Sequence, residues 1–272
     1  MSNNLKLYCV TDKPLKKLEN SHLILAGVGS NSFSSKYISS SEKKNINFKE
    51  KNYSELTFHY WFWKNLLENE QAKWVGFCQK RRFWIKKRLE NIKISQDNIQ
   101  DYLLTEIPEE LNNYESFLCE PIFVNKVKKI KMLKKGYRSL IKKPSIFYNE
   151  RIQSLKFHFD MHHGYGNLDK AINCMNKKDK EDFRNYMSSN ISFNPHIMFI
   201  SKPDIAKSWF EDLFVWLFEC EKIFGFKNLK GYETTRLYAY LAERYLSFWF
   251  KKYTKYKNLP WAFCDMSENQ LN

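Results

Sequence analysis

The segment Tyr53–Trp84 constrains the fold more than any other part of the chain. Its first half carries apolar residues at helical spacing with further aromatic residues between them, and a helix that is apolar on most sides must be buried. Ser54 is a suitable N-cap, so the sequence predicts a buried helix from there to about Asn69. The apolar run Trp74–Cys78 follows as a buried strand.

Four polar residues follow this strand: Gln79, Lys80, Arg81 and Arg82. In α/β proteins ligands bind outside the carboxyl ends of strands, and a guanidinium group binds phosphate oxygens bidentately without a metal. The sequence therefore predicts a site for a phosphorylated ligand at this strand end. A solvated strand end is the simpler alternative, since basic residues are common there.

The 272 residues carry a net charge of +15, which favours anionic partners such as nucleotides, nucleic acid or an acidic membrane surface. No apolar run reaches the roughly 20 residues that span a bilayer, and the N-terminus lacks a signal-peptide pattern. The six cysteines include no Cys-x-x-Cys pair, and several lie in apolar runs, which argues against a zinc site or a disulfide framework. We therefore expect a cytoplasmic protein.

Two further strands are expected near the N-terminus, over Leu5–Thr11 and His22–Val28, and the polar segment Ser30–Lys51 is expected to be a loop. Helical spacing resumes over Phe83–Gln100. The later residues predict two strands and then two long helices: Glu115–Val124, His196–Ser201, Ala206–Phe224 and Tyr232–Tyr253. Strands that alternate with helices early, and helices concentrated late, predict an α/β core with a helical C-terminal region.

The segment Lys126–Lys143 contains nine lysine and arginine residues with apolar residues between them. Two interpretations are open. The segment lies on an anionic membrane surface with its apolar residues at the interface, or it is a surface helix with a solvated basic face. If the first interpretation is correct, the cytoplasmic protein is located peripherally at the inner face of the cytoplasmic membrane.

Two later clusters contain titratable residues. The first is a histidine cluster: His158, Asp160, His162 and His163. Asp-x-His is a weak metal signal, so proton transfer or acceptor binding is the preferred role for this cluster. The second cluster is on the last helix: Arg236, Glu243 and Arg244. Spacings of seven and eight residues return to one helix face, where these side chains either hold a ligand or form a buried ion pair.

The chain contains no P-loop, G-x-G-x-x-G, G-x-S-x-G or H-E-x-x-H motif. Four segments instead occur in this order along the chain: YSELTFHYWFWKN…VGFCQKRRFW, MHHGYGNLDKA, MFIS and R-x6-ERYLSFW. Together they resemble a bacterial glycosyltransferase family of capsule and O-antigen gene clusters. The resemblance runs from about Leu5 to Phe250. Two positions depart from the family pattern: its His-Tyr is Gln79-Lys80 here, and Ile197 replaces an asparagine. The residues on the family's motif positions are Glu55, Leu56, Thr57, Tyr60, Trp61, Trp63, Lys64, Asn65, Arg81, Arg82, His163, Arg236, Glu243 and Arg244.

This resemblance implies a GT-A-like α/β fold and transfer of a hexose to a glycan or undecaprenyl-linked acceptor in capsule or lipopolysaccharide O-antigen synthesis. Galactofuranose from UDP-galactofuranose is the leading donor. GT-A enzymes place a metal-binding Asp-x-Asp at the strand end that carries Gln79–Arg82 here, so we expect fixed cations to replace the metal and no cofactor to be needed. We also expect inversion at the anomeric carbon. The expected division is a single domain with a nucleotide-sugar half (1–125), an acceptor half (126–254) and a C-terminal tail (255–272).

Residue roles follow from the resemblance and from the clusters above. The donor and its nucleotide are assigned to Thr11, Lys13, Glu55, Thr57, Trp61, Lys64, Gln79, Lys80, Arg81 and Arg82. The candidates for the catalytic base are Asp160 and His163, with Glu211 behind them. Support for the acceptor or nucleotide is assigned to His162, Arg236, Glu243 and Arg244.

Two other functions are compatible with parts of the sequence. Lysines and aromatic residues are typical of nucleic-acid-binding proteins, but the aromatic residues here cluster in a helix predicted to be buried, and no nucleic-acid motif is present. Nucleic acid is therefore not the expected partner. The two departures from the family pattern leave open an inactive scaffold of a polysaccharide assembly complex.

Overall fold

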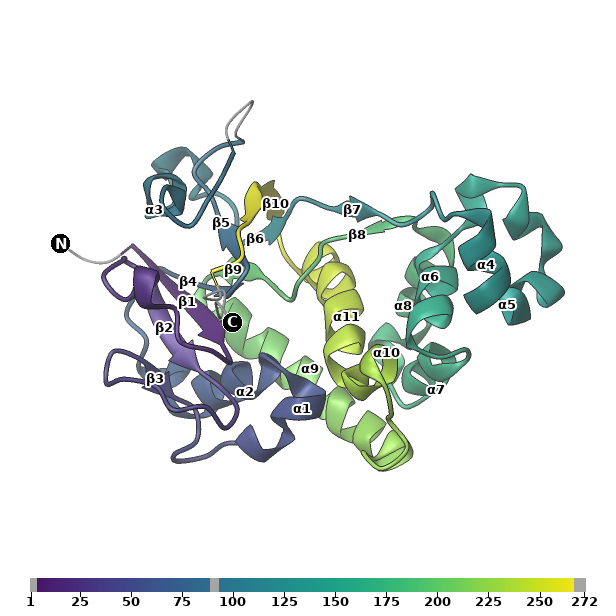
Figure 1. The fold of residues 1–272 in the computed structure, drawn as a ribbon, viewed down its shortest axis with the longest axis horizontal. Helices are drawn as coiled ribbons and strands as arrows, with labels where there is room; N and C mark the ends of the chain where they lie inside the picture. The colour runs from purple at the N-terminus through teal and green to yellow at the C-terminus, as the bar shows by residue number, and fades with distance from the viewer. Residues whose placement is uncertain (1–3, 89–92, 267–272) are drawn as a thin grey trace, which may run out of the picture. The chain divides into compact units, whose positions relative to one another are not determined.

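The computed structural model describes residues 4–88 and 93–266. The chain forms two compact units (Figure 1): unit 1 consists of Met1–Glu120, His196–Glu211 and Phe250–Asn272, and unit 2 consists of Pro121–Pro195 and Asp212–Trp249. Both units are assembled from non-contiguous segments, whereas the predicted halves are contiguous. Within the described residues, no helix combines the length and the apolar character needed to cross a membrane.

Unit 1 is built on a mixed sheet. Its strands are β1 (Leu5–Thr11), β2 (Ile24–Gly27), β3 (Ile38–Ser39), β4 (Trp74–Gln79), β5 (Arg82–Trp84), β6 (Ser116–Cys119), β9 (Phe199–Ser201), β10 (Tyr256–Leu259) and β11 (Trp261–Phe263). The order across the sheet is β10-β6-β9-β4-β1-β2-β3, with β5 joined to β4 and β11 joined to β5. β1 is parallel to both of its neighbours, and its register with β4 runs from Leu5 opposite Trp74 to Val10 opposite Gln79.

Helix α2 (Leu56–Asn65) packs on this sheet through its aromatic side chains. The ring of Phe62 lies 4.8 Å from the ring of Tyr8 in β1 and 5.2 Å from the ring of Phe77 in β4. All residues from 56 to 62 are buried, which confirms the predicted buried helix. The predicted N-cap is wrong, because Ser54 has a φ of 53° and ends the preceding helix α1 (Glu50–Tyr53).

Three other predicted elements differ from the structure. The segment Phe83–Gln100 is not a helix in its described part, since its first residues form β5 and pair with β11, and only α3 (Ile99–Tyr102) is helical. Residues 89–92 lie outside the described residues. The predicted strand Glu115–Val124 divides at Pro121 into β6 and β7 (Ile122–Phe123). The segment expected as a tail contributes β10 and β11 to the sheet, and its residues 267–272 lie outside the described part of the chain.

Unit 2 is mainly helical. Its elements are β7, α4 (Lys129–Lys135), α5 (Tyr137–Lys142), α6 (Leu155–His163), α7 (Asn167–Asn173), α8 (Lys177–Ser189), β8 (Ser192–Phe193), α10 (Tyr232–Thr235) and the parts of α9 (Pro203–Phe224) and α11 (Leu237–Tyr253) within residues 212–249. In its core the ring of Phe183 lies 5.8 Å from Trp216 and 5.4 Å from Tyr245. The helix predicted over Tyr232–Tyr253 is two helices that separate at Arg236. The predicted α/β class with a helical C-terminal region is confirmed.

His59 of α2 is a titratable residue in the core of unit 1. It is 1% exposed, its ring lies 4.4 Å from that of Phe77, and its Nδ1 has no hydrogen-bond partner in the described residues. Burial lowers the pKa of His59 to about 3. As the pH falls from about 6.5 towards 3, the unfolded chain binds a proton that the folded chain excludes, so the free energy of unfolding decreases.

We expect His59→Leu to raise the free energy of unfolding by about 1 kcal/mol at pH 7, because it removes a buried polar atom that lacks a partner. At pH 5 the gain should be about 2 kcal/mol larger, since the unfolded variant no longer binds the proton. Urea unfolding of both proteins at the two pH values measures these differences. A gain that does not grow between pH 7 and pH 5 would show that His59 takes up its proton in the folded protein.

Candidate functional site

The strand order of unit 1 reverses around β1. The chain passes from β1 to β2 and β3 on one side and then returns to β4 on the other side. Because β1 and β4 are parallel, their carboxyl ends lie at the same edge of the sheet. Open α/β sheets bind their ligands at such a switch point. The residues that end the two strands, Thr11 and Gln79, therefore mark the candidate site.

The loop after β1 is held in place by its own polar groups. The Oγ1 of Thr11 accepts a hydrogen bond from the backbone N–H of Lys13 at 3.0 Å and donates one to the carbonyl oxygen of the same residue at 2.5 Å. The carboxylate of Asp12 pairs with Lys80, which follows β4, so this ion pair joins the two strand ends. Lys13 is exposed. The loop thus presents one exposed ammonium group beside a cross-strand ion pair.

The residues Gln79–Arg82 form a hairpin turn that connects β4 to β5, with Gln79 paired to Arg82. The side-chain amide of Gln79 donates to the carboxylate of Glu55 and to the backbone oxygen of His196, the latter at 2.5 Å. Both N–H bonds of this amide are therefore used within the protein. Gln79 therefore contacts Glu55 on one side and Arg82, through its Oε1, on the other.

The two arginines of the hairpin contact the C-terminal segment. The Nε of Arg81 lies 2.9 Å from the Oδ2 of Asp265, and both side chains are 43% exposed. The guanidinium carbon of Arg82 lies 5.7 Å from the ring centre of Phe263, and its Nη1 lies 3.4 Å from the Oε1 of Gln79. A half-exposed ion pair contributes little, whereas a phosphate accepts two charge-assisted hydrogen bonds from one guanidinium. These arginines can therefore exchange their present contacts for a phosphorylated ligand.

The backbone that contacts Gln79 is strained, a feature that the sequence did not predict. His196 and Ile197 have φ values of 77° and 53°, and a β-branched residue in this region is an outlier. Asparagine adopts this conformation more readily than isoleucine does. Strain of this kind often marks functional sites. The ring of His196 lies 4.8 Å from that of Trp261.

Thr57 and Trp61 of α2 have structural partners. The hydroxyl of Thr57 is fully buried and donates to the carbonyl oxygen of Ser54 at 2.9 Å. The indole N–H of Trp61 donates to the carbonyl oxygen of Glu42 at 2.8 Å, and this side chain is 5% exposed. These contacts anchor the start of α2 and a preceding loop.

Lys64 and Glu211 line a cavity of unit 1 that is separate from the site at the ends of β1 and β4. Lys64 is at the end of α2, nine residues after Glu55, and a helix rises about 1.5 Å per residue. The cavity has a volume of about 410 Å³ and is also lined by Trp63, whose ring centre lies 2.9 Å from the Nζ of Lys64. Burial lowers the pKa of Lys64. Lys64, which was predicted to bind the donor, is thus separated from the hairpin. Of the three predicted catalytic bases, Glu211 belongs to unit 1, whereas Asp160 and His163 belong to unit 2.

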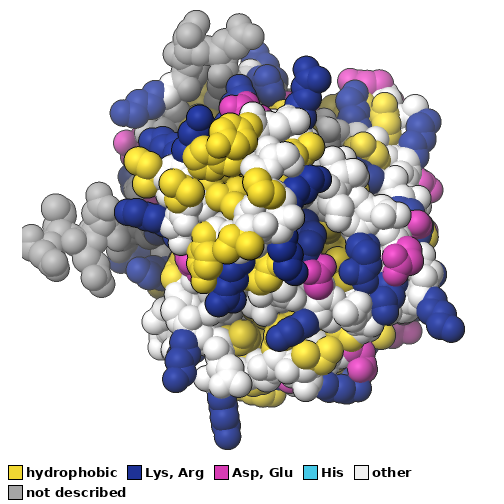
Figure 2. Space-filling model, turned by 90° about the vertical axis from the view of Figure 1, so that its right-hand side faces the viewer, with side chains coloured by type: hydrophobic (Ala, Val, Ile, Leu, Met, Phe, Trp, Pro, Cys, Tyr) yellow, Lys and Arg dark blue, Asp and Glu magenta, His cyan; other side chains and the backbone are white. Residues whose placement is uncertain are grey.

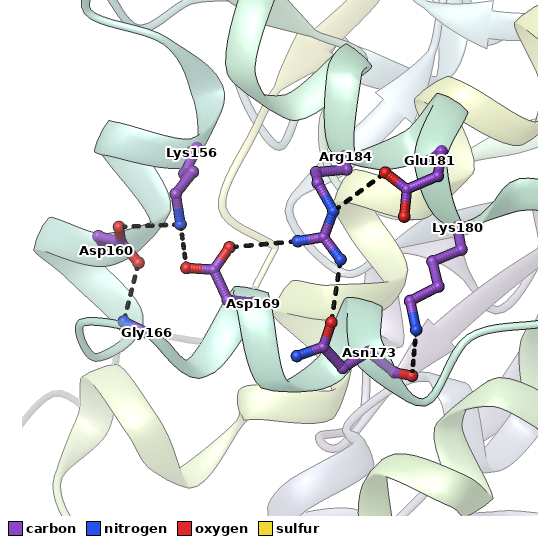
Figure 3. Close-up of polar contacts among 8 residues, drawn as sticks. All are labelled: Lys156, Asp160, Gly166, Asp169, Asn173, Lys180, Glu181 and Arg184. Carbon is purple, nitrogen blue, oxygen red and sulfur yellow. Dashed lines mark hydrogen bonds and ion pairs between the residues drawn. The ribbon is translucent and has the colours of Figure 1, made fainter.

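Asp160 of α6 belongs to a polar network in unit 2 (Figure 3). Its Oδ1 accepts a hydrogen bond from the backbone N–H of Gly166 at 3.1 Å, and Lys156 lies between its Oδ2, at 3.5 Å, and the carboxylate of Asp169, at 2.5 Å. Burial raises the pKa of Asp160. Asp160 also lines a cavity of about 350 Å³ that carries several cationic or hydroxyl side chains: Ser139, Lys142, Lys143, Arg151, Ser154, Lys156 and Tyr165.

His163 lies at the end of α6 and stacks on Tyr240 of α11 with ring centres 3.8 Å apart. Its Nδ1 lies 3.1 Å from the carbonyl oxygen of Glu233, which can only accept, so Nδ1 carries the hydrogen and Nε2 carries the lone pair. Burial, with a contribution from the charge of Arg244, lowers the pKa of His163 to about 3. His163 is therefore neutral near pH 7. The same two causes lower the pKa of His158 to about 2, and burial with nearby lysines lowers that of His162 to about 4.

Two residues of the late Arg…Glu-Arg motif, Glu243 and Arg244, form an ion pair. Arg244 is 2% exposed, pairs with Glu243, and places its guanidinium carbon 3.6 Å from the ring centre of Phe193. These contacts favour the buried ion pair over a ligand-binding role. Arg236 precedes α11 and is half-buried.

Within residues 4–88 and 93–266, no group of three or more His, Cys, Asp or Glu side chains is arranged to hold a metal ion.

The chain belongs to the family described as Domain of unknown function (DUF4422), whose model matches residues 6–255. A search of curated proteins gave no match. Among solved structures, the apo structure of WbbM, a bifunctional glycosyltransferase, is similar to this chain with a TM-score of 0.68 at 19% sequence identity. The similarity covers 96% of this chain and 45% of the WbbM chain, so this chain spans less than half the length of that protein. At this identity the similarity establishes the fold.

Proposed function

We propose that this protein is a glycosyltransferase that transfers galactofuranose from UDP-galactofuranose to a glycan or undecaprenyl-linked acceptor. The observation that carries the proposal is the cationic hairpin Gln79–Arg82 at the switch point of a fold that a bifunctional glycosyltransferase shares over 96% of this chain. The choice of galactofuranose, and of capsule or O-antigen polysaccharide as the product, rests on the motif resemblance.

The donor is assigned to the edge of the sheet in unit 1. Thr11 and Lys13 border the base and ribose, and Arg81 and Arg82 bind the diphosphate. Glu55 accepts hydrogen bonds from hydroxyl groups of the donor sugar. As the bond between the sugar and the diphosphate breaks, negative charge grows on the departing UDP, and fixed guanidinium groups stabilise that charge without reorganising. In other enzymes a divalent metal stabilises this charge, and here the guanidinium groups do so without a metal cofactor.

The acceptor is assigned to the cavity of unit 2 that Asp160 lines. Asp160 and His163 are the proposed bases that take the proton of the attacking hydroxyl group. Burial raises the pKa of Asp160 towards the range of a general base, which supports this role. His163 is unprotonated near neutral pH, but its lowered pKa makes it the weaker proton acceptor of the two. Attack from the face opposite UDP inverts the anomeric carbon.

Calorimetric titration with a nucleotide panel tests the donor assignment: UDP, UDP-galactofuranose, UDP-galactopyranose, GDP and CMP. We expect uridine-selective binding that is unchanged by EDTA, because protein cations rather than a metal neutralise the diphosphate. Binding that needs added manganese would contradict the metal-independent site. Failure to bind any nucleotide, together with salt-sensitive binding of random oligonucleotides, would favour a nucleic-acid-binding protein.

A further inference from the structure

Helices α4 and α5 of unit 2 expose large apolar side chains. Ile130 and Leu133 of α4 are 70% and 57% exposed, and Tyr137 and Ile141 of α5 are 48% and 75% exposed. Residues three or four apart lie on one face of a helix, so each pair forms a short apolar ridge. Met132, which packs in the small core beneath, is 1% exposed. We call the four exposed residues and the cations around them the α4–α5 surface.

The same stretch of chain is strongly basic. From Pro121 to Asn149 it contains no aspartate or glutamate and nine cations, all of them exposed: Lys126, Lys128, Lys129, Lys131, Lys134, Lys135, Arg138, Lys142 and Lys143. Nine charges are more than half of the net charge of +15 of the whole chain. Figure 2 shows hydrophobic side chains gathered among lysine and arginine side chains on one face of the molecule. A surface of this composition is complementary to a partner that is anionic outside and apolar beneath.

We propose that the α4–α5 surface binds an anionic phospholipid bilayer. Ile130, Leu133 and Ile141 insert at the boundary between head groups and acyl chains, and the surrounding lysines contact lipid phosphates. Tyr137 suits the interface because its ring is apolar and its hydroxyl remains hydrated. A nucleic-acid surface needs cations and stacking aromatics, and it gives exposed isoleucine and leucine side chains no role. The bilayer therefore accounts for both kinds of residue.

Co-sedimentation of the full chain with vesicles tests the apolar part of the proposal. We expect binding to vesicles that contain phosphatidylglycerol, and much weaker binding to vesicles of phosphatidylcholine alone or at high salt. The variant Ile130→Ser/Leu133→Ser/Ile141→Ser should lose binding by at least about tenfold. The matched control Val215→Ser/Ile223→Ser/Tyr232→Ser changes residues that are 62%, 52% and 80% exposed elsewhere in unit 2, and it should bind as the unmodified protein does.

A second pair of variants separates position from net charge. Lys129→Gln/Lys131→Gln/Lys134→Gln should weaken binding to anionic vesicles by at least about tenfold. Lys227→Gln/Lys230→Gln/Lys257→Gln removes the same charge at other exposed positions and should leave binding nearly unchanged. Equal losses in both variants would overturn the proposal. So would vesicle binding that survives the first variant while single-stranded oligonucleotide binding is lost. Neither readout depends on glycosyl transfer.

Discussion

Replacing Arg81 and Arg82 together by alanine is expected to lower turnover by at least about 1,000-fold, the effect of removing charge stabilisation from a transition state. The fold should survive, because Arg81 is 43% exposed and the hairpin itself is held by backbone pairing and by the buried Phe83 and Trp84. Initial rates with UDP-galactofuranose measure the turnover of this variant, titration with UDP measures its affinity for the nucleotide, and urea unfolding measures its stability.

Two further variants make this result specific. Lys86→Ala/Lys87→Ala removes two exposed cations a few residues further along the chain, and it should leave turnover within about twofold, because screened surface charges act weakly at a distance. Arg81→Lys/Arg82→Lys keeps the charge but not the bidentate geometry, so an intermediate loss is expected. Retained turnover in the double alanine variant would remove the diphosphate assignment.

Arg244→Ala is expected to lower the free energy of unfolding by about 3–5 kcal/mol, which is a large part of the stability of an ordinary domain. The guanidinium is 2% exposed, pairs with Glu243 and packs on Phe193, so alanine leaves both a cavity and a half-buried carboxylate that has lost this cation. Urea unfolding measures the loss. Arg236→Ala, at a half-buried position, should cost less than about 1 kcal/mol.

A rescue variant distinguishes structure from ligand binding at this position. Glu243→Leu/Arg244→Met replaces the ion pair by apolar side chains of similar length and should recover much of the stability that Arg244→Ala loses. If Arg244→Ala instead kept its stability and lost UDP affinity, the motif would serve the nucleotide. The burial of Arg244 leads us to expect the first outcome.

Elements that depend on a short run of residues were predictable. The strand predicted over Leu5–Thr11 has those bounds in the structure, and the strand predicted over Trp74–Cys78 is one residue longer. Parallel strands that are covered on both faces need an unbroken apolar run, and such a run is visible without any knowledge of the partner strand. The buried helix between them was visible for the same reason. Its aromatic residues cover most of its circumference.

The errors arose where a segment has two compatible conformations. Phe83–Gln100 has helical spacing, but Phe83 and Trp84 pair with Ala262 and Trp261 near the end of the chain. No feature within that segment reveals this partner. β9 enters the sheet between β4 and β6 in antiparallel orientation, and it too depends on strands more than 80 residues away. Propensity for a strand is decided largely by such cross-strand contacts.

The candidate site was likewise predictable only where it depends on residues that are adjacent in the chain. Arg81 and Arg82 were recognisable as a cationic strand end because the strand and the cations are adjacent in the chain. Their position at a switch point, the contact of Arg81 with Asp265 and the strain at Ile197 involve strand order and residues more than 100 positions away. Local patterns of hydrophobicity therefore fix which segments are buried, whereas long-range pairing decides what those segments face, because its energy comes from contacts that exist only after the chain has folded.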